Sequence, residues 1–243
     1  MIINRFLLII KNQPIFVDLS KKVSLPQKNK MEIVSVVTGD FVNSSKGDDL
    51  WRRAMLSIVD NAVAEMSGYL GIMQLEFFRG DSFQILVERP ENALRVAVLL
   101  RAALCSQTSS DCPFFWDARL AIGIGDVVYR SKDLAKSSGH AFIYSGRTLD
   151  DMKHERMAIR TSWESINEEF AVSTPFADDI ISNWTVRQAD LVYDSLLYDV
   201  SQFRMAVERE MSAQNVSKIL KAAKIELIKN YLHRFESLIY DRI

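Results

Sequence analysis

A β-hairpin between two helical stretches limits the fold of this chain more than any other feature of its sequence. Met73, Leu75 and Phe77 alternate with polar residues, and a second short run, Phe83–Val87, comes after the turn at 79–82. Period-two alternation on both sides of a glycine-containing turn is typical of a β-hairpin. The chain is therefore predicted to contain an antiparallel pair of strands at this point.

The patterns around the hairpin predict the order of the other elements. The apolar run Ile33–Val37 is typical of a strand buried on both faces, and apolar residues at helical spacing come after it. A second helix is predicted from Pro90, and the run Ala118–Tyr129 predicts a strand that Gly123 and Gly125 break. The order β-α-β-β-α-β, with an additional helix and a short strand at 157–161, predicts an α+β, ferredoxin-like sheet with helices on one face.

The composition excludes several classes of protein. With 30 basic and 31 acidic side chains, the chain is not expected to bind nucleic acid through bulk charge. Two cysteines and three scattered histidines fit neither a disulfide framework nor a zinc pattern, so we expect a protein of the reducing cytoplasm. The segment 204–234 is different, because it carries seven basic side chains against three acidic ones and could receive a polyanion.

The first 30 residues differ in charge from the rest of the chain. They carry six basic side chains and one acidic one, and the apolar run Phe6–Ile10 is too short to cross a membrane, so no membrane partner is expected. The polarity changes at Met31, which suggests that residues 1–30 are an extension not native to the fold and that Met31 is an alternative start. The other possibility is that Ile2–Ile10 adds an edge strand to the sheet.

Two aspartates emerge from this topology as candidate site residues. Asp40 ends the first predicted strand and Asp81 lies in the hairpin turn, and these elements are central neighbours in a split βαβ sheet. Paired carboxylates can hold Mg²⁺ or Mn²⁺ and, through it, a triphosphate, while the turn 41–45 offers backbone N–H groups to phosphates. The alternative is that each aspartate has only a structural role in its turn, where aspartate is common.

Three segments around these aspartates form a spaced set of motifs: 40–44 (Asp-Phe-Val-Asn-Ser), Arg79-Gly80-Asp81 in a hairpin 41 residues on, and the run 119–128 with its two glycines. In sequence and spacing they resemble the class III nucleotide cyclase homology domain. Gly139 stands eight residues before Arg147, as in the cyclase segment that precedes the catalytic arginine. The resemblance covers residues 31–172 and implies a nucleotide-cyclase-type domain.

Within that superfamily the chain is more similar to the SatD-like family, above all in the segments 39–44, 78–84 and 141–150. The resemblance implies that Asp40 and Asp81 are metal ligands and that Arg147 neutralises phosphate charge. The candidate phosphate contacts Phe41, Val42, Asn43 and Ser44 are predicted from the turn after the first strand. In cyclases this arginine comes from the partner subunit, so the resemblance also implies a homodimer. From the residues alone, Arg147 can equally form a local ion pair with Asp150 or Asp151.

Two departures from the cyclase pattern bear on catalysis. Phe77 stands where cyclases have the lysine that reads adenine, and Ile143 stands where they have the catalytic asparagine. Loss of a buried orienting amide typically costs about 10² to 10³ in rate, so cyclase turnover is not expected. His140 and His154 have no recognisable partner and are expected on the surface, and Trp116, Trp163 and Trp184 are expected to anchor the core or a domain junction.

Residues 173–243 are predicted to be a helical tail. Its helices are expected at 184–198, 200–210, 212–224 and 226–240, and the tight connection at Glu210–Ser212 is typical of a helix-turn-helix. The outer face of the third helix carries amides that can reach base edges and lysines that can reach phosphates, namely Gln214, Asn215, Ser217, Lys218, Lys221 and Lys224. The alternative is a helical bundle that dimerises or packs on the first domain.

Together these features predict a cytoplasmic regulatory protein in which a domain that binds a nucleotide or phosphorylated small molecule (31–172) is joined to a tail that binds duplex DNA. The alternative is a divergent metal-dependent cyclase or phosphoryl-transfer enzyme that uses Asp40 and Asp81. A third possibility is an interaction module with a vestigial site.

Overall fold

The structure is a computed structural model that describes residues 5–10, 13–18, 32–43, 49–78 and 80–243. The chain divides into two compact units, residues 1–31 and 32–243. In the first unit β1 (Arg5–Ile10) pairs antiparallel with β2 (Gln13–Asp18) in a two-stranded sheet of its own. Residues 19–31, where the sequence predicts the start of the fold, lie outside the described residues, so that expectation stays a prediction.

The second unit contains a mixed sheet in which the central strands are antiparallel. The strands run in the order β4-β5-β3-β6-β7, and β8 lies parallel to β6 beside the other end of that strand. Their bounds are β3 (Ile33–Phe41), β4 (Met73–Phe77), β5 (Ser82–Val87), β6 (Ala118–Tyr129), β7 (Ser138–Gly139) and β8 (Met157–Thr161). The predicted combination of helices with an antiparallel-rich sheet, the hairpin and the position of the first predicted strand beside that hairpin are confirmed.

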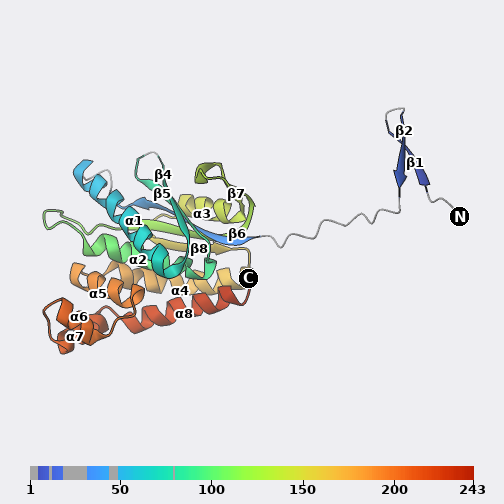
Figure 1. The fold of residues 1–243 in the computed structure, drawn as a ribbon. Coiled ribbons are helices and arrows are strands. Elements are labelled where there is room, and N and C mark those ends of the chain that lie inside the picture. The colour runs from blue at the N-terminus through green and yellow to red at the C-terminus, as the bar shows by residue number, and fades with distance from the viewer. Residues whose placement is uncertain (1–4, 11–12, 19–31, 44–48, 79) are drawn as a thin grey trace. The chain divides into compact units, whose positions relative to one another are not determined.

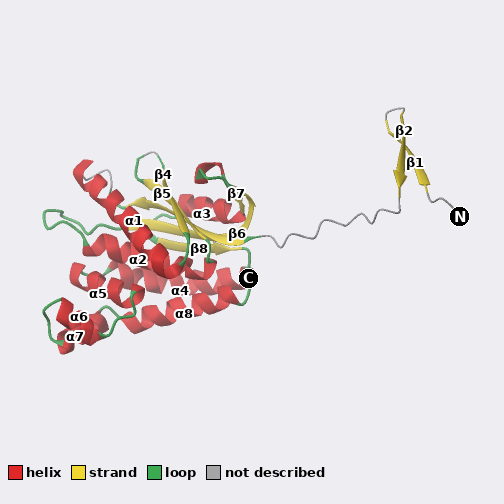
Figure 2. Ribbon diagram, viewed as in Figure 1, coloured by secondary structure: helices red, strands yellow, loops and turns green. Residues whose placement is uncertain are grey.

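Helices cover both faces of this sheet, as Figures 1 and 2 show, whereas the sequence predicted helices on one face. Val37 of β3 packs toward α1 (Asp49–Leu70) and α2 (Ala93–Ser106), which a short 3-10 turn, η2 (Pro90–Asn92), introduces. Val36, its neighbour in the strand, packs on the opposite face against Ala141 of α3 (His140–Asp151). Successive side chains of a strand alternate between faces, so the nearly continuous apolar run of β3 reflects burial on both sides.

The glycines of β6 explain how α3 comes so close to the sheet. A Cβ on Gly123 would lie 2.2 Å from the Ala141 carbonyl oxygen and 2.4 Å from the Ser145 nitrogen. The prediction that Gly123 and Gly125 break the strand is wrong, because β6 runs without interruption from Ala118 to Tyr129. The glycines serve close approach of a helix backbone instead. Thr38 of β3 then donates a 2.8 Å hydrogen bond to Ser145 of α3.

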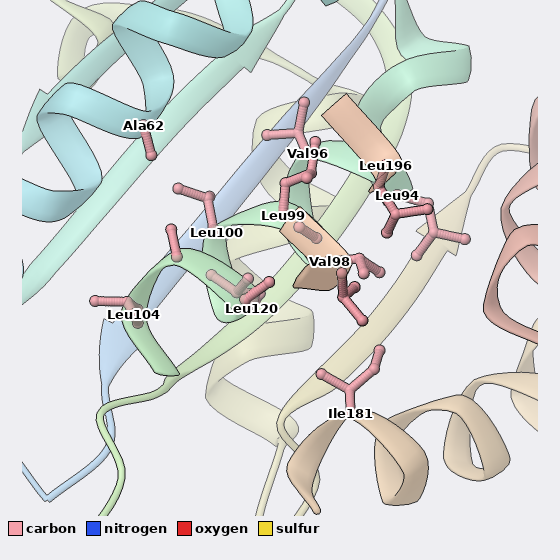
Figure 3. Packing of buried hydrophobic residues seen from close by; sticks show 14 of the residues in the cluster. Ala62, Leu94, Val96, Val98, Leu99, Leu100, Leu104, Leu120, Ile181 and Leu196 are labelled. Carbon is pink, nitrogen blue, oxygen red and sulfur yellow. The ribbon is translucent and has the colours of Figure 1, made fainter. Parts of the chain in front are cut away.

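Helix α2 is the centre of the core. Nearly every residue from Ala93 to Cys105 is buried, because the sheet covers one side of this helix and the C-terminal helices cover the other. Figure 3 shows Leu94, Leu99, Leu100 and Leu104 of α2 among residues of the same hydrophobic cluster, including Leu120, Ile181 and Leu196. One continuous core therefore joins the sheet to the tail.

The tail forms the helices expected from its periodicity, within a few residues at each end. They are α5 (Val186–Leu197), α6 (Gln202–Glu208), α7 (Ala213–Ala222) and α8 (Ile225–Tyr240). The sequence did not locate α4 (Glu164–Ser182), which runs through the predicted boundary after residue 172. Residues 32–243 form one compact unit, and the division at 172 stays a prediction about sequence segments. Among the described residues, no helix is both long and apolar enough to span a membrane.

Candidate functional site

Asp40 lies near the end of β3 and is held by an arginine of the neighbouring strand. It stands directly opposite Arg119 of β6, whose Nε donates a 2.9 Å hydrogen bond to Asp40 Oδ1. Arg119 Nη2 donates to the other carboxylate oxygen, Oδ2, and Nη1 donates to the Met152 carbonyl at 3.1 Å. The contact is a bidentate pair, which is the stronger geometry for an arginine and a carboxylate.

The other candidate ligand, Asp81, is at the same end of the sheet. Asp40 stands opposite Ser82 of β5, and Asp81 is the next residue in the hairpin turn. The pKa of Arg119 is raised, first by its hydrogen bonds to Asp40 and then by the charge of that carboxylate, with further contributions from Asp81 and Asp150; partial burial opposes the shift. Among the described residues, Asp40, Asp81 and Asp150 thus act on the guanidinium of Arg119 at this end of the sheet, which we call the acidic corner.

This arrangement does not present a ready divalent metal site. Both oxygens of Asp40 accept hydrogen bonds from Arg119, so a metal ion at Asp40 would have to compete with a guanidinium that is already paired there. Mg²⁺ requires closely spaced oxygen ligands in a near-octahedral arrangement. Among the described residues, no group of three or more acidic, histidine or cysteine side chains is placed to hold a metal. The residues as arranged therefore do not fit Mg²⁺ or Mn²⁺.

The turn after β3 offers less to a phosphate than its sequence suggests. The Val42 N–H donates a 2.9 Å hydrogen bond to the Asp117 carbonyl, and Phe41 is buried in the core. Asn43 comes next with a left-handed backbone at φ 60°, and Ser44 lies outside the described residues. Of the four predicted phosphate contacts in this turn, the Val42 N–H is therefore engaged within the protein and the Phe41 side chain is buried.

Arg147 lies on α3, on the sheet face that also carries Asp40. Its side chain is exposed, and it forms no ion pair with Asp150, Asp151 or any other described residue. The alternative role of Arg147, an ion pair with Asp150 or Asp151 on the same helix, is therefore not seen among the described residues. Ile143 is 45% exposed one turn earlier, where cyclases carry their asparagine.

The structure corrects the expectation that His140 lacks a partner. His140 Nδ1 makes a close contact with Asp126 Oδ1, and the imidazole stacks on Tyr144 at 5.5 Å between ring centroids. Sequence reasoning missed the pair because the two residues meet only where β7 packs on β6. The three tryptophans contact the core as expected: Trp116 and Trp184 are buried, Trp163 is partly buried against the same cluster, and Trp184 Nε1 donates to the Ala223 carbonyl at 3.0 Å.

A buried charge network was also missed. Arg101 of α2 is 1% exposed and donates two 2.9 Å hydrogen bonds to Asp117 and one of 2.6 Å to Asp178 of α4. Arg156 donates from its side chain to Asp117 and from its backbone to Asp178, both at 2.8 Å. The two arginines within the otherwise apolar run of residues 93–105, Arg95 and Arg101, were the available signal, since charged residues are buried almost only when paired.

In the tail, α6 and α7 are joined by four residues. Glu210, at the position where such turns often carry glycine, has a left-handed backbone at φ 51°. Ser212 caps α7 as predicted, with its side chain accepting from the Asn215 N–H. Val216 and Leu220 face inward, and the outer set is exposed: Gln214, Asn215, Ser217, Lys218, Lys221 and Lys224.

Comparisons with known proteins find likeness in structure only. No protein-family model matches the chain, and no curated protein does. One similar solved structure is the guanylyl cyclase Cya2, at 19% identity and a TM-score of 0.42, covering 57% of this chain and 78% of that one. Another is a bacterial light-regulated adenylyl cyclase, at 14% identity and a TM-score of 0.36 over 54% of this chain and 43% of that one. At these sequence identities and TM-scores, any argument about function has to rest on the chain's own residues.

The pairing of Asp40 with Arg119 leads to a prediction about metal binding. Arg119→Ala should bind Mn²⁺ at least tenfold more tightly than the unmodified protein, because the acidic corner loses a cation that repels the metal ion and competes with it for Asp40. Isothermal titration with MnCl₂ measures the difference. Arg160→Ala, which removes an exposed arginine paired with Glu164, is the matched control and should change nothing. If the unmodified protein binds Mn²⁺ as tightly as the variant does, the Asp40–Arg119 pair does not hinder metal binding.

Proposed function

We propose that this chain is a cytoplasmic, DNA-binding regulatory protein in which a ferredoxin-like, cyclase-type domain carries a helix-turn-helix. The observation that carries the proposal is the α6–turn–α7 arrangement: two short helices, a four-residue connection with a left-handed residue, and a capped second helix with a polar, exposed face. A recognition helix needs amides near its N-terminus for base edges and cations for phosphates. Gln214 and Asn215 lie in the first turn of α7, and Lys218 and Lys221 come after them on the exposed face.

The packing of the neighbouring helices supports this proposal. Helix α7 contacts both α5 and α6, which gives the three-helix arrangement in which a recognition helix is normally held. Arg209, in the turn, pairs with Asp190 and Asp194 of α5 and so ties the connection to the body of the protein. The acidic Glu208 opposes binding to DNA phosphates, although its charge is partly met by Arg204 at 2.8 Å.

For the first domain we propose binding of a nucleotide or phosphorylated small molecule without cyclase turnover. Support comes from Arg147, which is exposed and without an ion pair in the described part of the chain, on the sheet face that carries Asp40. A homodimer would let this arginine serve the partner's site, as the cyclase resemblance implies. Phe77 and Ile143 disfavour the alternative of a divergent cyclase, and the Asp40–Arg119 pair disfavours metal-dependent phosphoryl transfer. Divalent metal at Asp40 and Asp81 stays a proposal conditional on release of Arg119.

Sequence selection from a random DNA duplex pool, followed by salt titration of the selected site, tests the DNA proposal. Lys218→Ala should weaken binding to all sequences and flatten the plot of log affinity against log salt by about 0.9, the contribution of one neutralised phosphate. Gln214→Ala should instead lower discrimination between the selected site and random DNA by about 1 to 3 kcal/mol, with the salt slope unchanged.

Lys132→Ala is the matched control, since Lys132 is an exposed lysine in the turn after β6, outside the tail. It should leave both the slope and the discrimination as they are. The DNA-binding proposal fails if no enriched motif is recovered, or if Lys132→Ala flattens the salt slope as much as Lys218→Ala does.

A further inference from the structure

A groove between α3, β8 and α4 belongs to neither of the two sites proposed above. In Figure 1, β8 lies between α3 and α4, and both helices contact this strand. The groove has a volume of about 320 Å³, and its lining includes Asp151, Met152, Glu155, Met157, Phe170 and Ala171. It shares no lining residue with the acidic corner or with the exposed face of α7, so it has to be explained separately.

The floor of the groove is apolar and contains two thioethers. Met157 and Phe170 belong to the main hydrophobic core, and Met152 belongs to a smaller cluster that also contains Leu149. All three lining side chains are buried, so they hold fixed positions under the groove. Methionine sulfur makes favourable contacts with aromatic rings. An aromatic ring is therefore the apolar group that this floor favours over an aliphatic chain.

The wall formed by α4 leaves the groove open to solvent. Ala171 lines the groove and is exposed, and its side chain ends at the Cβ atom. Pro175, one turn later on the same helix, also lines the groove. A ligand can therefore reach the apolar floor without displacing a side chain of α4.

The charged side chains that line the groove are both carboxylates. Asp151 and Glu155 line it, and among the described residues no lysine, arginine or histidine does. Neither carboxylate forms an ion pair with a described residue. Arg147 lies one turn before Asp151 on α3 but is not part of the lining. The lining therefore favours a cation over an anion.

Glu155 is held in place by the backbone next to it. Its Oε2 accepts a 2.9 Å hydrogen bond from the Lys153 N–H and one of 3.1 Å from the His154 N–H. Backbone hydrogen bonds, first from its own N–H and then from these two, lower the pKa of Glu155. The side chain is thus a fixed negative charge at neutral pH, and a ligand does not have to order it on binding.

We propose that this groove binds a primary amine that carries an aromatic ring, with the ring on the methionine and phenylalanine floor and the ammonium beside Asp151 and Glu155. A volume of about 320 Å³ is sufficient for one bicyclic ring with a short side chain. A ligand of the same shape with a carboxylate would meet two like charges and no cation in the lining. A bare metal ion would gain nothing from the apolar floor. The inference depends neither on DNA binding nor on nucleotide binding.

Isothermal titration of the full chain with tryptamine at pH 7 tests the proposal. A dissociation constant of about 0.1 to 1 mM is expected for a ligand of this size. Indole-3-propionate has the same ring with a carboxylate in place of the ammonium, and it should bind at least about tenfold more weakly.

Variants of the lining separate the apolar contact from the charge. Ala171→Phe fills the open wall and should weaken tryptamine binding at least about tenfold, whereas Ala64→Phe, at an exposed alanine of α1, is the matched control and should change nothing. Asp151→Asn and Glu155→Gln each remove one charge at nearly constant shape and should weaken binding about threefold to fivefold. Asp60→Asn, at an exposed aspartate of α1, is the control for these two.

Four results would overturn the proposal. The first is no heat of binding up to about 10 mM tryptamine. The second is binding that neither Ala171→Phe nor the charge variants weaken, because the amine would then bind elsewhere. The third is equal or tighter binding of indole-3-propionate, because the carboxylates would then not select the ligand. The fourth is self-association of the chain that Ala171→Phe abolishes, because the groove would then be an interface between copies.

Discussion

Replacement of Arg101 by methionine is expected to lower the free energy of unfolding by about 3 to 5 kcal/mol, because it leaves buried carboxylates without their main cation. Arg101 is fully enclosed and supplies three of the hydrogen bonds that Asp117 and Asp178 accept from side chains. Domains of this kind are stable by only about 5 to 15 kcal/mol, so a loss of this size is readily measured by chemical denaturation. Arg160→Met is the control, because Arg160 is exposed near the end of β8 and pairs with Glu164 at the start of α4. This substitution should lower the free energy of unfolding by less than about 0.5 kcal/mol.

The same network sets a pH dependence. Burial alone raises the pKa of Asp117, but the charges and hydrogen bonds of Arg101 and Arg156 outweigh burial and hold it below the ordinary value of 3.8. A carboxyl with a lowered folded-state pKa stabilises the protein above its unfolded pKa and loses that contribution as the pH falls through the folded one. Stability of the unmodified protein should therefore decline below about pH 3.8.

In Arg101→Met the shift of the Asp117 pKa is expected to change sign, because burial then dominates and Asp117 takes up a proton more readily. The difference in unfolding free energy between the variant and the unmodified protein should shrink between pH 7 and pH 5. Denaturation curves at several pH values measure it. A difference that is constant across this range would mean that the buried carboxylates are not the source of the instability.

Local patterns in the sequence were sufficient to predict most of the elements of the second unit. Alternation and helical spacing are properties of a few adjacent residues, so β5, β6, α5 and α7 fall close to their expected ranges. The hairpin turn then places Asp81 beside Ser82, opposite Asp40, as the split βαβ topology requires. The sequence analysis did not predict helix α4, because α4 has no break at the expected domain boundary and contains a proline, Pro175.

The chemistry of the candidate site was less predictable, because it depends on which side chains meet across the sheet. Asp40 was expected to face a metal, yet it pairs with Arg119, a residue 79 positions away that is opposite it only in the folded register. Nothing in the motif around Asp40 indicates that partner. The Arg101 network likewise links four separate segments, and only the presence of a charge inside an apolar helix pointed to it.

Gly123→Ala is expected to be the other strongly destabilising substitution, costing about 3 kcal/mol, since α3 is held against β6 at a distance that leaves no room for a methyl group. The added Cβ would lie 2.2 Å from the Ala141 carbonyl oxygen and 2.4 Å from the Ser145 nitrogen, both of which are backbone atoms that cannot turn away. The helix must shift, and the loss belongs at the upper end of the range for overpacked cores. Such a shift would also disturb the 2.8 Å hydrogen bond from Thr38 to Ser145.

Two glycines of the same protein provide the controls for this prediction. Gly146, on α3 itself, and Gly68, on α1, have no heavy atom within 4 Å of an added Cβ. Gly146→Ala and Gly68→Ala should therefore raise the unfolding free energy by about 0.5 to 1 kcal/mol, because alanine restricts the unfolded chain and favours the helix. Urea denaturation of the three variants separates the effects. If Gly123→Ala is as stable as Gly146→Ala, then α3 does not lie as close to β6 as the geometry requires, and the placement of Arg147 beside the sheet fails with it.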